Sequence, residues 1–184
     1  MTDAAEKDVI SLLRDQHQRI RGLFDDVSGA STTESKQVLF DELRRLLAVH
    51  ETAEEMVTHP RARMADGNAV VDSLLAEEHE AKEMLADLDG MDVSDAGFDA
   101  KLATLRSAVL AHAEHEELEE FPLLRSSNDE QSLELMAKAV RAAEAIAPTH
   151  PHPRAGESLI TNAALGPIAS VVDRTRDAVR AVLG

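Results

Sequence analysis

The sequence repeats one arrangement of ionisable residues at a fixed separation. Four pairs of identical residues lie 62 positions apart: His17 and His79, His50 and His112, Glu54 and Glu116, and Pro60 and Pro122. Each copy contains one histidine, a turn, and a later His-x-x-x-Glu motif that a proline follows. Such a repeat favours a fold built from two similar halves. Glu55 and Glu117 match at the same separation, but we expect both on the far sides of their helices.

Apolar residues recur at helical spacing in blocks that turn residues separate, and no block alternates as a strand does. Ser31 with Glu34 and Ser127 with Glu130 are capping-box patterns, and a proline is expected to end the second helix. The predicted helices cover Glu6–Val27, Ser31–His59, residues 68–88, Phe98–Arg125, residues 127–146, and Pro167 to the C-terminus. The prediction is an all-α fold, a four-helix up-down bundle over residues 1–125 with two extra C-terminal helices in residues 126–184.

The repeated histidines and glutamates fall on the apolar stripes of these helices. Residues four apart point to the same side of a helix, so each His-x-x-x-Glu motif presents both side chains in one direction. A buried carboxylate without a partner is costly, and imidazole with carboxylate suits first-row transition metals. Two similar halves favour two metals bridged by the two glutamates. The predicted metal ligands are His17, His50, Glu54, His79, His112 and Glu116.

These motifs resemble those of the hemerythrin-like HHE cation-binding domains, whose pattern is H…HxxxE…H…HxxxE on four bundled helices. The segments "DQHQRI", "HETAEEMVTHP", "EEHEAK" and "HAEHEELEEFP" are similar to its four helices in order, and the resemblance covers Asp8 to Arg125. It implies a non-haem di-iron centre with the four histidines as terminal ligands of two iron ions and Glu54 and Glu116 as bridges. Ligand type alone also admits zinc or manganese.

One departure from the family bears on oxygen carriage. Oxygen-carrying hemerythrins have a fifth histidine on the third helix, four residues from another, whereas the positions four before and four after His79 are Leu75 and Glu83. With fewer imidazoles, an iron ion has positions for water, carboxylate or an exogenous ligand.

Further ionisable residues near the motifs are either additional metal ligands or flanking and solvated side chains. Glu51 and Glu83 are alternatives as additional ligands, and His115 is favoured as a flanking or hydrogen-bonding residue over a ligand. Glu119 is expected to be solvated at the end of its helix. The histidines that precede prolines are expected in solvated loops: His59, His150 and His152.

Composition excludes several classes of function. The 184 residues carry a net charge of −16, which argues against a nucleic-acid surface. There is no cysteine and no tyrosine, so thiolate sites and a tyrosyl radical are excluded. No secretion signal and no run of eighteen apolar residues is present, so we expect a cytoplasmic protein without membrane contact. The C-terminal helices are expected to pack on the bundle or to form a homo-oligomer.

Three uses of such a centre compete at this level. A binding protein would hold a small diatomic ligand such as O₂ or NO, or would store or sense iron. An enzyme of catalase type would disproportionate peroxide. An interaction protein would expose a surface in response to iron or oxygen, a role that the family resembled here allows, since it includes the iron-sensing hemerythrin domain of an F-box ubiquitin ligase subunit. The sequence favours binding and peroxide or NO chemistry over signalling, because its C-terminal segment contains no recognisable output motif.

Overall fold

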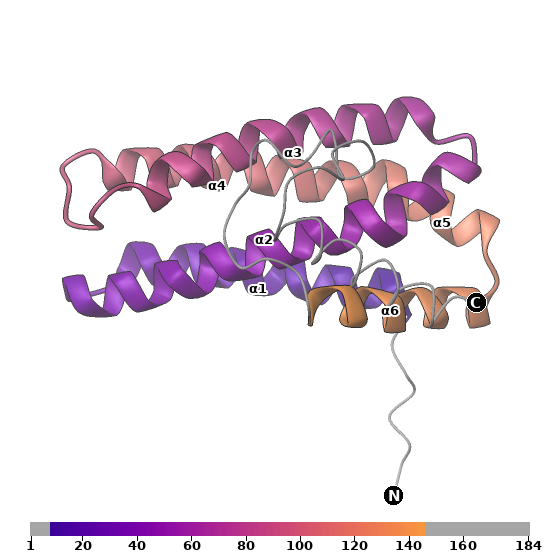
Figure 1. The fold of residues 1–184 in the computed structure, drawn as a ribbon, viewed down its shortest axis with the longest axis horizontal. Helices are drawn as coiled ribbons and strands as arrows, with labels where there is room; N and C mark the ends of the chain where they lie inside the picture. The colour runs from indigo at the N-terminus through magenta and orange to yellow at the C-terminus, as the bar shows by residue number, and fades with distance from the viewer. Residues whose placement is uncertain (1–7, 146–184) are drawn as a thin grey trace, which may run out of the picture.

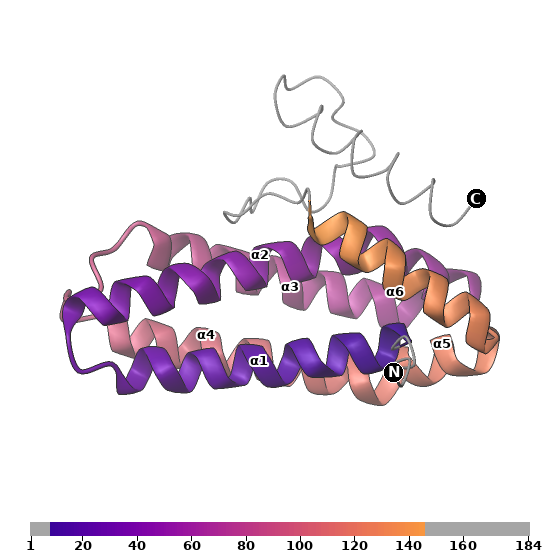
Figure 2. The same ribbon diagram turned by 90° about the horizontal axis from the view of Figure 1, so that it is seen from below.

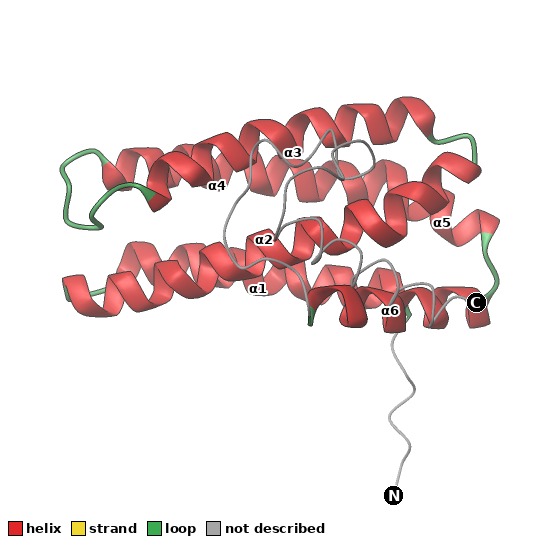
Figure 3. Cartoon of the chain, in the orientation of Figure 1, coloured by secondary structure: helices red, strands yellow, loops and turns green. Residues whose placement is uncertain are grey.

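The computed structural model describes residues 8–145, and every regular element in this range is a helix (Figures 1 and 3). The elements are α1 (Val9–Gly29), α2 (Thr33–Met64), α3 (Asn68–Asp89), α4 (Phe98–His115), the π-helix η1 (Glu116–Glu120), α5 (Phe121–Ser127) and α6 (Glu130–Glu144). The all-α prediction is confirmed for this range. The predicted helix from Pro167, together with His150 and His152, lies outside the described residues.

The four long helices form an antiparallel bundle. Two views at right angles place α1 beside α2 and α4, and α3 beside α2 and α4 (Figures 1 and 2). In each helix the buried positions alternate steps of three and four residues, as in Leu13, His17, Ile20, Phe24 and Val27 of α1. That alternation keeps one stripe facing the bundle axis, because its mean step is close to the helical repeat.

The helix ends differ by a few residues from those predicted. The α2 capping box consists of Thr32 and Ser35 and not of Ser31 and Glu34. The prediction that Pro60 ends this helix is wrong, because α2 continues through it to Met64. Pro60 lies on the exposed side, while Ala62 beyond it is buried, so packing of the later turn outweighs the lost backbone hydrogen bond. At α6 the cap is Asp129, whose side chain accepts from the Ser132 amide.

Two apolar clusters lie along the bundle, and a polar layer separates them. One cluster contains Leu13, Val57 and Phe121, and the buried side of α6 belongs to it. The other contains Phe24, Phe40 and further residues toward the opposite end. Buried histidines and glutamates occupy the helix positions between these clusters. Among the described helices, none combines the length and the apolar character that a membrane crossing requires.

Candidate metal centre

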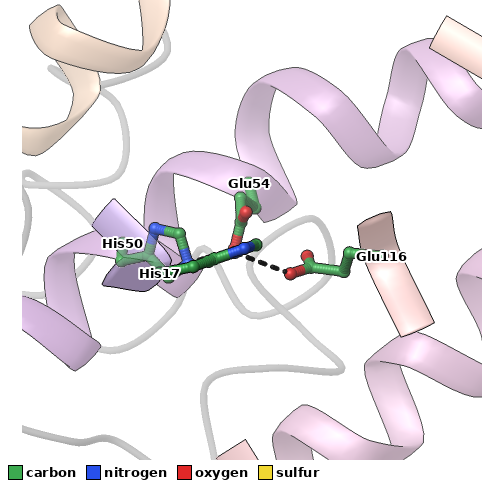
Figure 4. A group of neighbouring side chains, drawn as sticks. All are labelled: His17, His50, Glu54 and Glu116. Carbon is green, nitrogen blue, oxygen red and sulfur yellow. Dashed lines mark ion pairs between the residues drawn. The ribbon is translucent and has the colours of Figure 1, made fainter. Parts of the chain in front are cut away.

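Four of the predicted ligands converge in the polar layer. His17 comes from α1, His50 and Glu54 from α2, and Glu116 is the first residue of η1 (Figure 4). Each offers one ligand atom within 4.8 Å of the others, and all four side chains are buried. Nε2 of His17 lies 3.2 Å from Oε2 of Glu116, and Nε2 of His50 lies 3.3 Å from Oε2 of Glu54.

The histidines of this layer share one hydrogen-bonding arrangement. Nδ1 of each ring faces an oxygen that can only accept, so Nδ1 carries the donated proton and Nε2 is directed inward. The partners are Glu117 Oε1 at 2.9 Å for His17, Gln16 Oε1 at 2.7 Å for His50, and Glu77 Oε2 at 3.1 Å for His112. An outer acceptor on one ring nitrogen is what metal-binding histidines typically have.

Several inward polar atoms lack a hydrogen bond in the described part of the chain. Those in or beside the four-residue group are Nε2 of His17, Nε2 of His112, and both carboxylate oxygens of Glu54 and Glu116. Oε2 of Glu120 and Nδ1 of His79 are also buried without a hydrogen bond, outside that group. Buried polar groups are normally satisfied, since leaving one without a partner costs about 1–3 kcal/mol. A cation bound among the atoms in or beside the four-residue group would satisfy them together, and their mixture of imidazole and carboxylate fits a transition metal.

A model of the hemerythrin HHE cation-binding domain matches residues 8–124. The chain belongs to this family. Its fold is also that of a solved hemerythrin HHE cation-binding domain-containing protein from Mycobacterium kansasii, with a TM-score of 0.67, 22% identity, and coverage of 91% of this chain and 99% of the other.

A second relative is longer than this chain. A protein named DNA nickase from Nostoc sp. is 24% identical over 143 residues, which are 78% of this chain. They are only 41% of the relative, so the chain spans about two fifths of that protein's length. The family match itself establishes a cation-binding domain, and the buried histidine and glutamate group is where this hemerythrin domain offers ligands.

Charges in the hemerythrin site are arranged around Glu54 and Glu116. Burial and the neighbouring Glu116 raise the pKa of Glu54 well above its usual range. Burial would also raise the pKa of Glu116, but His112 and His17 lower it to about 2. For His17, the carboxylates of Glu116 and Glu117 outweigh burial and raise the pKa. Burial and the nearby His17 lower the pKa of His50 to about 3, so this imidazole is neutral.

His112 adjoins the four-residue group, whereas His79 does not. Nε2 of His112 is 3.6 Å from Oε1 of Glu116 and 3.9 Å from Oε1 of Glu78. His79 was predicted on the α3 stripe, but its side chain is 43% exposed and its Nε2 lies 3.6 Å from Glu83 on the same surface. The stripe of α3 runs through Glu78, which is fully buried. The structure therefore does not bring His79 to the site that the sequence predicts for it.

Sequence reasoning missed a second set of buried charges next to the site. His59, expected in a solvated loop, is buried in α2, because the helix continues past Pro60. Its Nδ1 lies 2.8 Å from Oε1 of Glu120 and its Nε2 lies 2.6 Å from Oε1 of Glu78. Burial opposes a charge on this ring, but the two carboxylates raise the pKa of His59 well above its usual range. Unlike the other buried histidines, it has no nitrogen left for a metal.

Lys82 brings a second positive charge to this set. Its ammonium contacts Glu55, lies 3.1 Å from Oε2 of Glu78, and lies 3.7 Å from Oε2 of Glu51. Burial alone would lower the pKa of Lys82, but the three carboxylates outweigh it and raise this pKa above the usual range. Glu51 is buried, as one reading required, yet it faces this ammonium and is not a member of the four-residue group.

The π-helix changes which glutamates face inward at the end of α4. With one extra residue in its turn, η1 buries both Glu116 and Glu120 and leaves Glu119 exposed. Glu117, expected on the far side, reaches Nδ1 of His17 instead. His115 remains at the flank, where its Nδ1 lies 2.8 Å from Glu77, the residue that also contacts His112.

A small cavity borders the ligand group. Its volume is about 10 Å³ for the centre of a water-sized sphere, which is near the minimum for one water molecule. Its polar lining consists of His17, His50, His112, Glu116 and Glu51, and apolar residues of three helices complete it: Ile20, Leu47, Val109, Leu110 and Ala113. This space admits only a small molecule next to the inward ring nitrogens.

Proposed function

We propose that this hemerythrin domain binds two iron ions as a non-haem di-iron centre. The first position is formed by His17, His50, Glu54 and Glu116, and the second includes His112 and shares both glutamates. The observation that carries the proposal is the arrangement of three histidines with Nδ1 bonded outward and Nε2 directed into a buried group of carboxylates. The family's cation-binding character and the donor chemistry support it.

We further propose that the centre serves a small diatomic ligand or peroxide. An iron pair with an open position supplies binding and electron transfer toward O₂, NO or peroxide. The chain's own contribution is steric and electrostatic. The apolar side of the cavity excludes larger molecules and bulk water. Glu54 and His17, whose pKa values are raised, hold protons that a bound cation would displace. Nicking of DNA is not part of this proposal, because 35 acidic residues against 19 basic residues disfavour a phosphate backbone.

The test is metal loading of the whole chain. The protein is reconstituted anaerobically with ferrous iron, and the iron content per chain is measured by mass spectrometry for wild type, Glu54→Ala and Glu116→Ala. We expect about two iron ions in wild type and comparable losses in both variants, with Glu119→Ala as the exposed control at full content. Full iron content in both variants would overturn the bridging roles. Preference for manganese over ferrous iron in competition, against the usual order of affinities, would overturn iron.

The same loaded protein separates the competing uses. Hydrogen peroxide is added to the reduced form while oxygen evolution and the optical spectrum are recorded. Sustained evolution of oxygen would assign peroxide disproportionation, the enzymatic alternative. A stoichiometric spectral change with NO or O₂ and no turnover would assign ligand binding or sensing.

A further inference from the structure

The two halves of the bundle are related by two different sequence separations. Between α2 and the continuous segment of α4 and η1, buried positions correspond at 62 residues, the separation of the sequence repeat: Phe40 with Leu102, Leu43 with Leu105, Leu47 with Val109, His50 with His112, and Glu54 with Glu116. Between α1 and α3, buried positions correspond at 61 residues: Leu13 with Leu74, Ile20 with Ala81, Phe24 with Leu85, and Val27 with Leu88.

For His17, the correspondence of buried positions and the repeat of identical residues therefore point to different residues on α3. The identity repeat matches His17 with His79, but the residue 61 positions after His17 is Glu78. Glu78 is fully buried, whereas the His79 side chain is 43% exposed. A shift of one residue turns a helical side chain by about 100°, which suffices to move it from the bundle axis to the surface. Glu78 thus occupies in the second half the place that His17 has in the first.

The surroundings of Glu78 complete this correspondence. Its Oε1 lies 3.9 Å from Nε2 of His112, and the same nitrogen lies 3.6 Å from Oε1 of Glu116. The neighbours also correspond. The Phe121 ring stacks on His17 with centroids 5.8 Å apart, and His59, which precedes Phe121 by 62 positions, contacts Glu78.

We propose that Glu78, and not His79, is the third-helix ligand of the second cation position, together with His112, Glu54 and Glu116. The inference rests on the proposed function, since it assigns one ligand of that centre. It makes the centre asymmetric. The first position has two imidazoles and two carboxylates, and the second has one imidazole and three carboxylates.

The buried cations next to Glu78 make the two positions unequal in another respect. His59 and Lys82 already contact the two oxygens of Glu78, at 2.6 and 3.1 Å. A metal at the second position must compete with these contacts, whereas Glu54 and Glu116 in the first position have no hydrogen bond among the described residues. The first position therefore fills before the second, and a species with one cation per chain accumulates.

The test compares two adjacent residues. Wild type, Glu78→Gln and His79→Ala are titrated anaerobically with ferrous iron, and the number of ions bound is measured by calorimetry and mass spectrometry. We expect two unequal steps in wild type and in His79→Ala, and one step in Glu78→Gln. Glutamine preserves the side-chain volume, and circular dichroism with a melting curve verifies the fold.

Each result has a separate meaning. Two ions in Glu78→Gln, one ion in His79→Ala, or loss of both ions in a folded Glu78→Gln would overturn the assignment. If Glu78→Gln does not fold, Glu78→His retains a ligating group at the same place and must bind two ions; fewer than two would overturn the assignment. No ion bound by wild type would instead refute the proposed function.

Discussion

Glu144, the last residue of α6, is connected to the candidate metal centre through one side chain. Nε2 of Gln16 donates to Oε1 of Glu144 at 2.6 Å, and Oε1 of Gln16 accepts from Nδ1 of His50 at 2.7 Å. The carboxylate thereby fixes the orientation of the amide, and the amide fixes the tautomer of the imidazole. Because α6 lies beyond the family match at residues 8–124, this support comes from outside the matched domain.

Loss of this connection should lower the affinity of the site for metal by a predictable amount. Removal of an outer hydrogen-bond partner of a metal-binding histidine typically lowers metal affinity by about 10- to 100-fold, or about 1.4–2.7 kcal/mol. We expect Gln16→Ala to fall in that range, because Gln16 contacts His50 directly. Glu144 is one hydrogen bond further from His50, and Glu144→Ala leaves the Gln16 amide in place. The affinity should therefore fall by about 10-fold or less.

The assay is an anaerobic ferrous titration of wild type, Gln16→Ala and Glu144→Ala, with the affinity of the tighter step as the readout. Gln18→Ala is the matched control, since Gln18 is a glutamine of the same helix with an exposed side chain. Melting curves separate a loss of affinity from a loss of fold. Unchanged affinity in a folded Gln16→Ala, or an equal loss in Gln18→Ala, would refute the reasoning.

Three further predictions concern protons, cavity space and backbone packing. Because the pKa of Glu54 is raised, its carboxyl keeps a proton to a higher pH than usual, and a bound cation must displace that proton. Iron affinity should therefore rise with pH, and calorimetry in two buffers should detect at least one proton released. Ala113→Val narrows the cavity, so azide binding to the loaded protein should weaken while iron content stays constant; unaltered azide affinity would contradict the location of the open position. A Cβ at Gly67 would lie 2.6 Å from the Ala62 carbonyl oxygen, so Gly67→Ala should destabilise the fold by about 1–3 kcal/mol, whereas Gly22→Ala, with open space, should stabilise it by about 0.5–1 kcal/mol in denaturant unfolding.

The sequence was sufficient for the fold class, and it named the four residues that the structure brings together as a candidate metal-binding group. Helical periodicity and the repeat at 62 positions predicted the four-helix bundle, and four of the six predicted ligands converge in it. Three of these four were predicted together because α2 and the segment of α4 and η1 keep the same separation throughout, from Phe40 to Glu54 in one and from Leu102 to Glu116 in the other. Identity and packing therefore agreed on these two helices.

The predicted and observed positions of side chains differ on α3, where residue identity and packing disagree. His79 was chosen because it matches His17, and steps of four from Val71 to Leu75 to His79 drift around the helix by about 40° at each step. The buried stripe instead alternates threes and fours through Leu74 and Glu78. A search for that alternation would have found Glu78 from the sequence alone.

Two other features had weaker sequence signals. His59 was misjudged because a proline follows it, although a proline on the exposed side of a long helix can be tolerated when later turns are packed. The burial of Glu120 and the contact of Glu117 with Nδ1 of His17 both occur in the π-helix, whose extra residue per turn leaves no mark in the apolar periodicity.

The most direct test of the central claim is the amount of iron that the folded wild-type chain retains after anaerobic reconstitution and removal of free metal. We expect about two iron ions per chain in wild type, held in a buried site, and a loss of this iron in Glu54→Ala and Glu116→Ala. A stably folded chain that retains no iron under these conditions would contradict it.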